Sequence, residues 1–299
     1  MSSPQEQELP SKELANTYFV HTRENRDELQ RLIIQDRVTT TMMGGPFPEQ
    51  DEPARFRRVL DVGCGSGGWI METAQMYPHI SLSGIDISNR MIAYAREQVT
   101  AQGLSDRVEF HVMDALRMLE FPSGFFDLVN LRFGSSWVRK WDWPNLLQEM
   151  LRVTRPGGVV RLTDIEVLHG TNSEAHRQLC RMVVSAFFRA GYFFEEESTG
   201  VTTHLVPLLK QYGCQRVQEK KYALEFKAGT PEGQVCVEDI KALARGLQPF
   251  LQKWTKTPTD YAAFLQQYHD EVEQDDFYAT WNFLTAWGNK PDVSNQVGK

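Results

Sequence analysis

A run of glycines directly after a short apolar segment is the strongest constraint on how this chain of 299 residues can fold. Residues 59–62 are predicted to form a buried strand, and Gly63, Gly65, Gly67 and Gly68 follow at the start of a helical segment. Glycine adopts the positive φ angles of a tight turn and leaves bare backbone for a ligand to approach. The first amides of a helix favour a polar or anionic group. The segment therefore predicts a strand–loop–helix unit that binds a ligand.

Strands and helices are predicted to alternate through the first half of the chain. Besides 59–62, the apolar runs that predict strands are residues 80–87, 108–113, 126–131 and 159–165. The helical segments between them are residues 69–77, 89–102 and 143–153. Such alternation is typical of an α/β fold, in which helices cover both faces of a mostly parallel sheet.

The segments on both sides of this core have a different pattern. Residues 11–41 have apolar positions at helical spacing, and Gly44-Gly45-Pro46 would end that helix. Beyond residue 167 the patterns predict helices near 175–187, 205–212, 237–251 and 261–268, and strands at 216–226 and 277–287. We therefore divide the chain into a disordered tail (1–13), an N-terminal helical extension (14–57), a core (58–166), a helical lid insert (167–215), the remaining core strands with C-terminal helices (216–291), and a second tail (292–299).

Two ligands fit the glycine segment when it is taken alone. The spacing Gly63-x-Gly65-x-x-Gly68 satisfies the fingerprint of a dinucleotide-binding loop, with Asp86 placed to bind a ribose. NAD requires the loop to hold a pyrophosphate. S-adenosylmethionine has no phosphate, and its amino-acid end and ribose would lie over the loop. The glycine spacing does not separate these two cofactors.

The residues around the loop resemble four motifs of the class I S-adenosylmethionine-dependent methyltransferases, in the order in which that family has them. They are Asp61-x-Gly63-x-Gly65-x-Gly67, Gly84-Ile85-Asp86-Ile87-Ser88, Val112-Met113-Asp114-Ala115 and Leu151-Arg152-Val153-Thr154-Arg155-Pro156-Gly157-Gly158. The resemblance covers about residues 58–166. It implies a Rossmann-like, seven-stranded, mostly parallel sheet, S-adenosylmethionine as the cofactor, and methyl transfer as the reaction.

The resemblance also implies roles for single residues. Asp86 would accept hydrogen bonds from both ribose hydroxyls, since a carboxylate can accept two. Asp114 would accept one from the adenine amino group, with Ile87 and Ala115 flanking the ring. The alternatives are a helix N-terminal acid for Asp86 and an ordinary turn aspartate for Asp114.

The remaining cofactor contacts lie in the loop and at two further positions. Asp61 would either orient the loop or reach the ammonium group of the cofactor. Asn130 lies where this family places the reacting edge, and the region of Tyr18 often closes over the cofactor in this family. The contacts assigned on this basis are Tyr18, Asp61, Gly63, Gly65, Gly67 and Asn130.

The sequence contains no clear catalytic base. A base is needed only if the nucleophile carries a proton when it attacks, and the weak candidates are His21, His169 and His204. A metal is not expected, because Asn130 stands where a metal-dependent enzyme of this fold would have its first acid, although Asp164 is in range. The aromatic residues of the 167–215 insert indicate an apolar pocket for the acceptor.

Composition excludes several other classes of protein. The net charge is −7 with both signs mixed along the chain, so a nucleic-acid partner is not expected. No apolar run reaches the length of a membrane span, and the polar, acidic N-terminus does not fit a secretory signal. The four cysteines match no zinc pattern, which favours free thiols and the cytoplasm. A homodimer is left open.

We therefore expect a methyltransferase that acts on a small molecule, such as a natural product or a quinone-type acceptor. Two alternatives remain at this point. One is a cofactor-binding protein of the same fold that transfers no methyl group, such as a regulator or a cyclase. The other is an NAD(P)-dependent oxidoreductase, which would need an active-site donor pair that the sequence does not show.

Overall fold

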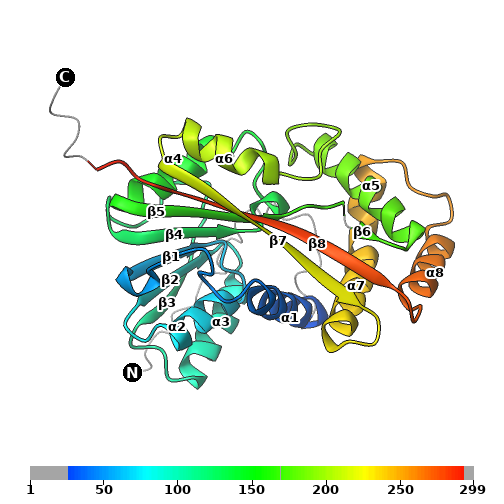
Figure 1. Ribbon diagram of the computed structural model, residues 1–299, viewed down its shortest axis with the longest axis horizontal. Coiled ribbons are helices and arrows are strands. Elements are labelled where there is room, and N and C mark those ends of the chain that lie inside the picture. The colour runs from blue at the N-terminus through cyan, green and yellow to red at the C-terminus, as the bar shows by residue number, and fades with distance from the viewer. Residues whose placement is uncertain (1–25, 169, 293–299) are drawn as a thin grey trace, which may run out of the picture.

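The computed structural model describes residues 26–168 and 170–292 (Figure 1). Within this part of the chain, eight strands form one sheet in the order β3-β2-β1-β4-β5-β8-β6, and β7 pairs with the free side of β8. The fold predicted from the sequence is confirmed: a mostly parallel, Rossmann-like sheet with helices on both faces. No helix in the described ranges is long and apolar enough to span a lipid bilayer.

The parallel part of the sheet comes from the first half of the chain. Its strands are β1 (Arg58–Val62), β2 (Ser81–Asp86), β3 (Val108–Val112), β4 (Phe126–Arg132) and β5 (Thr154–Ile165). β1 lies between β2 and β4, and all five strands run parallel. The chain order changes direction on the two sides of β1, and in open α/β sheets ligands bind at the carboxyl end of such a position.

Three strands complete the sheet. β8 (Tyr278–Asn289) runs antiparallel between β5 and β7 (Gln215–Lys227), so that β7 is again parallel to β5. The short β6 (Gly170–Thr171) pairs with the first half of β8. The sequence predicted seven strands and missed β6, because two residues are too few to show any periodicity.

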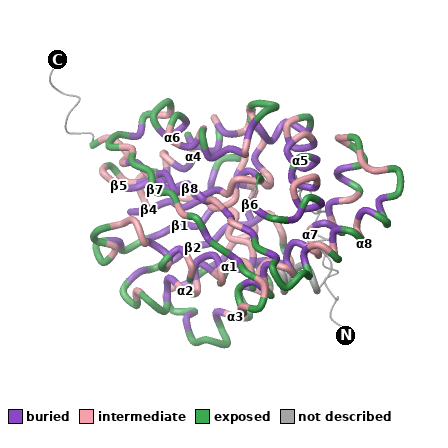
Figure 2. Tube along the Cα trace, turned by 45° about the vertical axis from the view of Figure 1, so that its right-hand side comes forward, coloured by how far each residue is buried: buried purple, intermediate pink, exposed green. Residues whose placement is uncertain are grey.

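Helices cover both faces of the sheet. α2 (Gly68–Met76) and α3 (Asn89–Ala101) pack on one face, and α4 (Trp143–Val153) and α6 (Thr202–Gln211) on the other. Each face has its own hydrophobic cluster, and Figure 2 shows buried residues along the strands and the inner sides of the helices. The alternating apolar residues of the strands supply both clusters, because successive side chains point to opposite faces.

A helical cap lies beyond the carboxyl ends of the parallel strands. It consists of α1 (Arg26–Met42), α5 (Glu174–Arg189), α7 (Pro231–Trp254) and α8 (Tyr261–Val272). α5 packs against α7 and α8, and α1 against α7 and α2 (Figure 1).

The cap differs from the lid expected for residues 167–215. Of that segment, α5 joins the cap, whereas α6 packs on the sheet against β5, β7 and β8. The cap gains α7 and α8 from the long connection between β7 and β8. Periodicity along one segment cannot show which distant helices will bury its apolar face, so the partners of α5 were not predictable.

Candidate functional site

A cavity of about 440 Å³ lies between the carboxyl ends of the parallel strands and the cap. The glycine loop and the ends of β2, β4 and β5 line one part of it, and α1, α5, α7 and α8 line the rest. Its volume lies within the range of about 300–1,000 Å³ that is typical of small-molecule sites. One continuous cavity therefore joins the predicted cofactor loop to the cap.

The glycine loop has the backbone geometry that its sequence predicted. Gly63, Gly65 and Gly67 all have positive φ angles. A Cβ atom at Gly65 would meet nothing within 4 Å, and this residue lines the cavity. A Cβ at Gly67 would lie 2.5 Å from the ring of Phe110, so this glycine allows α2 to start close against the sheet. Gly65 is therefore the position where a ligand can lie directly against the loop.

Asp86 connects the end of β2 to the glycine loop. One carboxylate oxygen accepts a hydrogen bond from the Gly65 amide at 3.0 Å, and the other from the Ser88 amide at 2.8 Å. Ser88, and not Asp86, caps α3 with its side chain. Asp86 is almost fully buried yet lines the cavity. Because each carboxylate oxygen can accept more than one hydrogen bond, both can also bind a ligand diol.

The turn after β3 brings the other predicted contacts to the same cavity. Asp114 accepts the Leu116 amide at 3.0 Å and forms an exposed ion pair with Arg117 at 3.2 Å. Ile87, Asp114 and Ala115 all line the cavity. The turn is therefore fixed by Asp114 itself, and it places two apolar residues and a carboxylate together, as binding to adenine would require.

Asp61 and Asn130 are neighbours in register on β1 and β4. The Asn130 side-chain amide donates to Asp61 at 2.8 Å. Asp61 lines the cavity, whereas Asn130 is completely buried and is not among the residues that line it. Burial raises the pKa of Asp61 to about 7, although the hydrogen bond from Asn130 and the charge of Arg161 oppose this rise. The structure thus places Asn130 behind Asp61 and not at the cofactor contact expected for it.

A short 3₁₀ helix, η2 (Gly134–Ser136), holds Trp137 against the glycine loop. Both oxygens of Asp164 bind Ser135, one to its hydroxyl at 2.6 Å and the other to its amide at 2.9 Å. The Trp137 indole lies 3.0 Å from the place where a Cβ of Gly63 would be. Asp164, which the sequence left in range of a metal, therefore fixes this segment. Among the described residues, no group of three or more His, Cys, Asp or Glu side chains could hold a metal ion.

The cap is joined to the core at Arg132, the last residue of β4. Its guanidinium forms an ion pair with Asp36 of α1 and donates to the Thr40 hydroxyl at 2.9 Å. Burial lowers the pKa of Arg132 to about 9. From the same helix, Gln35 donates to Asp239 of α7 at 3.1 Å. α1 is therefore the cap helix that joins β4 of the core to α7 along one wall of the cavity.

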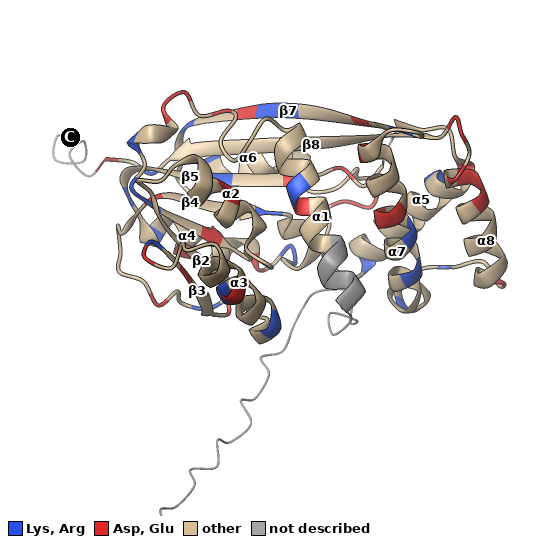
Figure 3. Ribbon diagram, turned by 90° about the horizontal axis from the view of Figure 1, so that it is seen from below, with Lys and Arg blue, Asp and Glu red and all other residues tan. Residues whose placement is uncertain are grey.

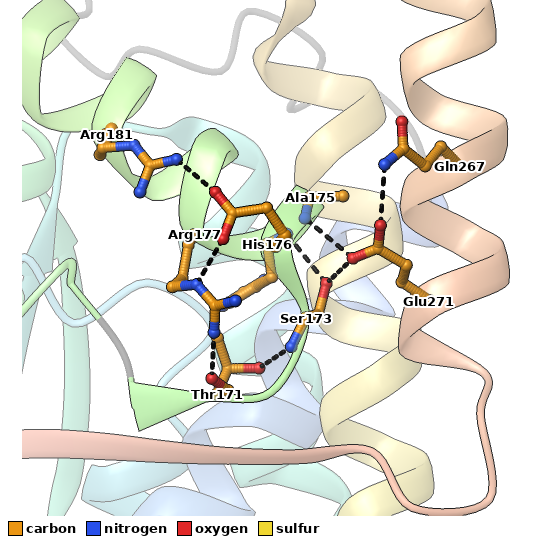
Figure 4. A network of polar contacts seen from close by, with 9 residues as sticks. Thr171, Ser173, Ala175, His176, Arg177, Arg181, Gln267 and Glu271 are labelled. Atoms are coloured by element: carbon orange, nitrogen blue, oxygen red, sulfur yellow. Dashed lines mark hydrogen bonds and ion pairs between the residues drawn. The ribbon is translucent and has the colours of Figure 1, made fainter.

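The cap end of the cavity is mostly apolar and contains a buried histidine. His176 lines the cavity, and its Nδ1 lies 2.9 Å from the hydroxyl of Tyr268, which also lines it. Glu271 of α8 accepts hydrogen bonds from the Ser173 hydroxyl and the Ala175 amide, both at 2.8 Å, and so fixes the start of α5 beside His176 (Figure 4). Burial lowers the pKa of His176 to about 4, so the ring is neutral near pH 7.

The comparisons with known proteins identify the core of the chain. Residues 59–158 match the family model described as a methyltransferase domain. The match covers about a third of the chain and identifies a methyltransferase domain in its core. It contains the glycine loop, Asp86 and Asp114, and it ends within β5.

Two curated relatives match the chain over a little more than a third of its length. Ajmaline N-methyltransferase of Rauvolfia serpentina is 38% identical over 114 residues, which is 38% of each chain. The U6 snRNA (guanine-N(2))-methyltransferase of Bos taurus is 34% identical over 106 residues, or 35% of this chain and 21% of that protein. The chain therefore spans well under half the length of these relatives, and the acceptors in the names of the two differ.

A solved structure extends the likeness in fold beyond the methyltransferase domain. Phosphoethanolamine N-methyltransferase 2 of Haemonchus contortus, in complex with phosphomonomethylethanolamine and S-adenosylhomocysteine, has a TM-score of 0.55 at 21% identity. The match covers 93% of this chain and 61% of that chain. It shows that the likeness in fold extends over most of the chain.

The predicted site residues are thus distributed unevenly around the methyltransferase domain. The structure brings together at the cavity Asp61, Gly63, Gly65, Asp86, Ile87, Asp114 and Ala115. His204 packs on Phe194 with ring centroids 4.4 Å apart and is not among the lining residues. Tyr18, His21 and His169 lie outside the described residues. His176 was not selected from the sequence, although it is adjacent to Ala175 on the apolar stripe of α5 that faces the cavity.

Proposed function

We propose that the whole chain is an S-adenosylmethionine-dependent methyltransferase whose acceptor is a small molecule with a largely apolar body. The observation that carries the proposal is the single cavity lined at one end by the glycine loop and Asp86, and at the other by the cap. A methyl donor and an acceptor must share one enclosed space, because the methyl group passes directly between them. We include natural products and quinone-type compounds among the candidate acceptors.

The residues of the methyltransferase domain fit the parts of the cofactor. Asp86 would bind the ribose hydroxyls, and the turn of Ile87, Asp114 and Ala115 the adenine. Gly65 would lie against the amino-acid end, with the ammonium group close to Asp61. When bound, S-adenosylmethionine supplies a methyl group on a positively charged sulfur that is displaced in line by a nucleophile. The chain itself orients the two partners and excludes water from them.

The cap end would hold the acceptor. Its lining is mainly aliphatic and aromatic, with His176 and Tyr268 among its few polar groups. A neutral imidazole can accept a hydrogen bond, so His176 would orient an acceptor hydroxyl, thiol or amine toward the methyl group, whereas its pKa of about 4 makes it a weak base. We assign this role to His176 among the described residues, and Tyr268 would hold the imidazole in place through Nδ1.

The charge of the chain also favours a small acceptor. Binding to a nucleic-acid backbone depends on basic surface. This chain has a net charge of −7, and Figure 3 shows acidic and basic residues interspersed along the helices. We therefore propose a small molecule as acceptor, and not RNA or DNA.

Calorimetry with matched glycine variants tests the cofactor. S-adenosylhomocysteine should bind to the protein, and NADH should not bind comparably. Gly65→Ala should lower the affinity for S-adenosylhomocysteine at least about tenfold, because the added methyl group would occupy space that the ligand needs. Gly103→Ala is the control, because Gly103 also has positive φ and open space for a Cβ but lies on the exposed turn after α3. Equal effects of both variants, or tighter binding of NADH, would refute the cofactor assignment.

Turnover of an acceptor panel tests the reaction. The protein would be incubated with S-adenosylmethionine and apolar phenols, thiols and amines, and products would be detected by mass spectrometry. His176→Phe should lower kcat while leaving the affinity for S-adenosylhomocysteine unchanged, and the exposed His79→Phe should change neither. Tight cofactor binding with no methylated product from any acceptor class would favour the alternative, a cofactor-binding protein that transfers no methyl group.

A further inference from the structure

A row of buried polar side chains crosses the sheet behind the glycine loop. Asp61 on β1, Asn130 on β4 and Arg161 on β5 are partners in register, so their side chains lie side by side on one face of the sheet. Arg161 reaches Glu49, a residue of the segment between α1 and β1, through two hydrogen bonds of 2.7 and 3.1 Å. Arg161 and Glu49 are both almost completely excluded from solvent at their side chains. The row therefore runs without interruption from Glu49 to the cavity.

The chemistry of the row gives it a direction. A guanidinium group has only hydrogen-bond donors, so the side-chain oxygen of Asn130 must face Arg161. Arg161 Nη1 donates to this oxygen, Oδ1, at 2.8 Å. The Asn130 amino group then has to face Asp61, to which it donates at 2.8 Å. One oxygen of Asp61 is thus held by the row, while the residue also lines the cavity. Each member is oriented by the one before it, starting from Arg161.

We propose that Glu49, Arg161 and Asn130 are positioning residues, which orient the Asp61 carboxylate and determine how readily it carries the negative charge that pairs with the ammonium group of the bound cofactor. The inference rests on the proposed cofactor, S-adenosylmethionine. The cationic end of that ligand would need an ionised partner in a buried position, because burial of an unpaired charge is costly. The row supplies that partner from behind, because Glu49, Asn130 and Arg161 are not among the residues that line the cavity.

The charges that face Asp61 explain why the row is sensitive to substitution. Burial and the nearby Asp86 raise the pKa of Asp61, and the Asn130 hydrogen bond and Arg161 lower it, with a result of about 7. Cys64 adjoins the same carboxylates, and burial raises the pKa of its thiol well above the usual range. Glu49 compensates the charge of Arg161 and so weakens its effect on Asp61. Removing the charge of Glu49 should therefore lower the pKa of Asp61, and removing the Asn130 donor should raise it.

Titration of Asp61 in the protein without ligand tests the row directly. The Asp61 carboxyl signal, followed by ¹³C NMR and assigned by its loss in Asp61→Asn, should have its midpoint near the pKa of about 7. Glu49→Gln leaves Arg161 uncompensated and should lower the midpoint by about one pH unit. Asn130→Leu removes the donor and should raise it by a similar amount. Glu49→Asp keeps the negative charge, so its midpoint should lie nearer to that of the unchanged protein than the midpoint of Glu49→Gln does.

Binding of S-adenosylhomocysteine, measured by calorimetry over the same pH range, should follow the same midpoints, because it has the same ammonium group. Asp127→Asn is the matched control. Asp127 is a buried acid on β4 that pairs with Arg155 at 2.5 Å, and it is not among the cavity-lining residues. This variant should cost stability and leave the Asp61 midpoint unchanged.

The possible results separate the two proposals. Unchanged midpoints in Glu49→Gln and Asn130→Leu would overturn the positioning role, whether or not the ligand binds. Shifted midpoints without any binding of S-adenosylhomocysteine would leave the row in place but refute the cofactor. If one variant fails to fold, the midpoint of the other still decides the outcome, since each has its own predicted direction.

Discussion

The Asp86 carboxylate holds two amides of its own chain and lines the cavity at the same time. Asp86→Ala should remove the ribose contacts, and it should also loosen the loop at Gly65. Hydrogen bonds to a charged group contribute about 1.5–3 kcal/mol each, so affinity for S-adenosylhomocysteine should fall at least about tenfold by calorimetry. Asp106→Ala, an exposed acid outside the cavity, is the control. Unchanged affinity in a folded Asp86→Ala protein would leave Asp86 with only its role in the loop.

The raised pKa of Asp61 implies that its negative charge lowers the stability of the protein, although the same charge would favour ligand binding. Folding raises its pKa from 3.8 to about 7, so the folded state holds the proton more tightly than the unfolded state. The free energy of unfolding therefore decreases as pH rises from about 4 to about 7, and the contribution of Asp61 stays constant above that range. Asp61→Asn avoids this loss.

The variant should thus have a higher Tm than the unchanged protein, by a difference that grows between about pH 4 and pH 7, where it corresponds to a few kcal/mol. It should also lose affinity for S-adenosylhomocysteine above pH 7, where Asp61 would be charged. Thermal scans and calorimetry at a series of pH values measure both effects. An equal Tm difference at every pH would show that the carboxylate does not titrate between folded and unfolded states as described.

Sequence patterns identified single residues where a local motif exists. Asp86 and Asp114 stand at strand ends within recognisable motifs, and both line the cavity. His176 and Tyr268 are 92 residues apart and meet only because α5 packs on α8. The role of Asn130 behind Asp61 depends on strand register, which no local pattern determines. Contacts within a motif could thus be predicted, and contacts between distant elements could not.

At the level of elements, a buried ion pair between Asp36 and Arg132 helps to hold α1 to the core. Asp36→Asn would leave the Arg132 guanidinium without its carboxylate partner in a buried position, and breaking such a pair costs about 3 kcal/mol. Amide hydrogen exchange should rise along α1 (Arg26–Met42), because the helix would open more often. Affinity for S-adenosylhomocysteine should fall with it, since Asp36 and Arg132 both line the cavity.

Glu174→Gln is the matched control for this ion pair. Glu174 pairs with Arg177 and Arg181 on the surface of α5, where solvent screens the charges, so its removal should change little. Exchange in α1 that is equally fast in both variants would show that the Asp36–Arg132 pair does not hold the helix.

The element boundaries were predictable where composition changes sharply. β1 and β4 are short apolar runs, and the structure places both within about one residue of the predicted limits. α1 ends at Met42, two residues before the first of the two positive-φ glycines, Gly44 and Gly45, that predicted its end. The cap was assigned less well, because an amphipathic helix shows that it has an apolar face but not which helix covers that face.

For the whole molecule, the position of the cavity between core and cap couples ligand binding to the stability of both. A ligand that binds between core and cap stabilises the folded form by about 2.7 kcal/mol at a concentration 100 times its Kd. Saturating S-adenosylhomocysteine should therefore raise Tm by several degrees and slow proteolysis between α7 and α8. The comparison is the Gly65→Ala protein at the same ligand concentration. Equal protection in that variant would mean that the effect does not arise from the cavity.

The position of β8 has a consequence for the order in which the chain can be built. Residues 278–289 pair with β5 on one side and β7 on the other, so the last described strand to leave the ribosome enters the interior of the sheet. Until it emerges, β5 and β7 each expose an unpaired edge, and such edges promote association with other chains. The sheet of the nascent protein is therefore incomplete while α7 and α8 are synthesised. The yield of folded protein in cells should depend on chaperones that cover the two exposed edges.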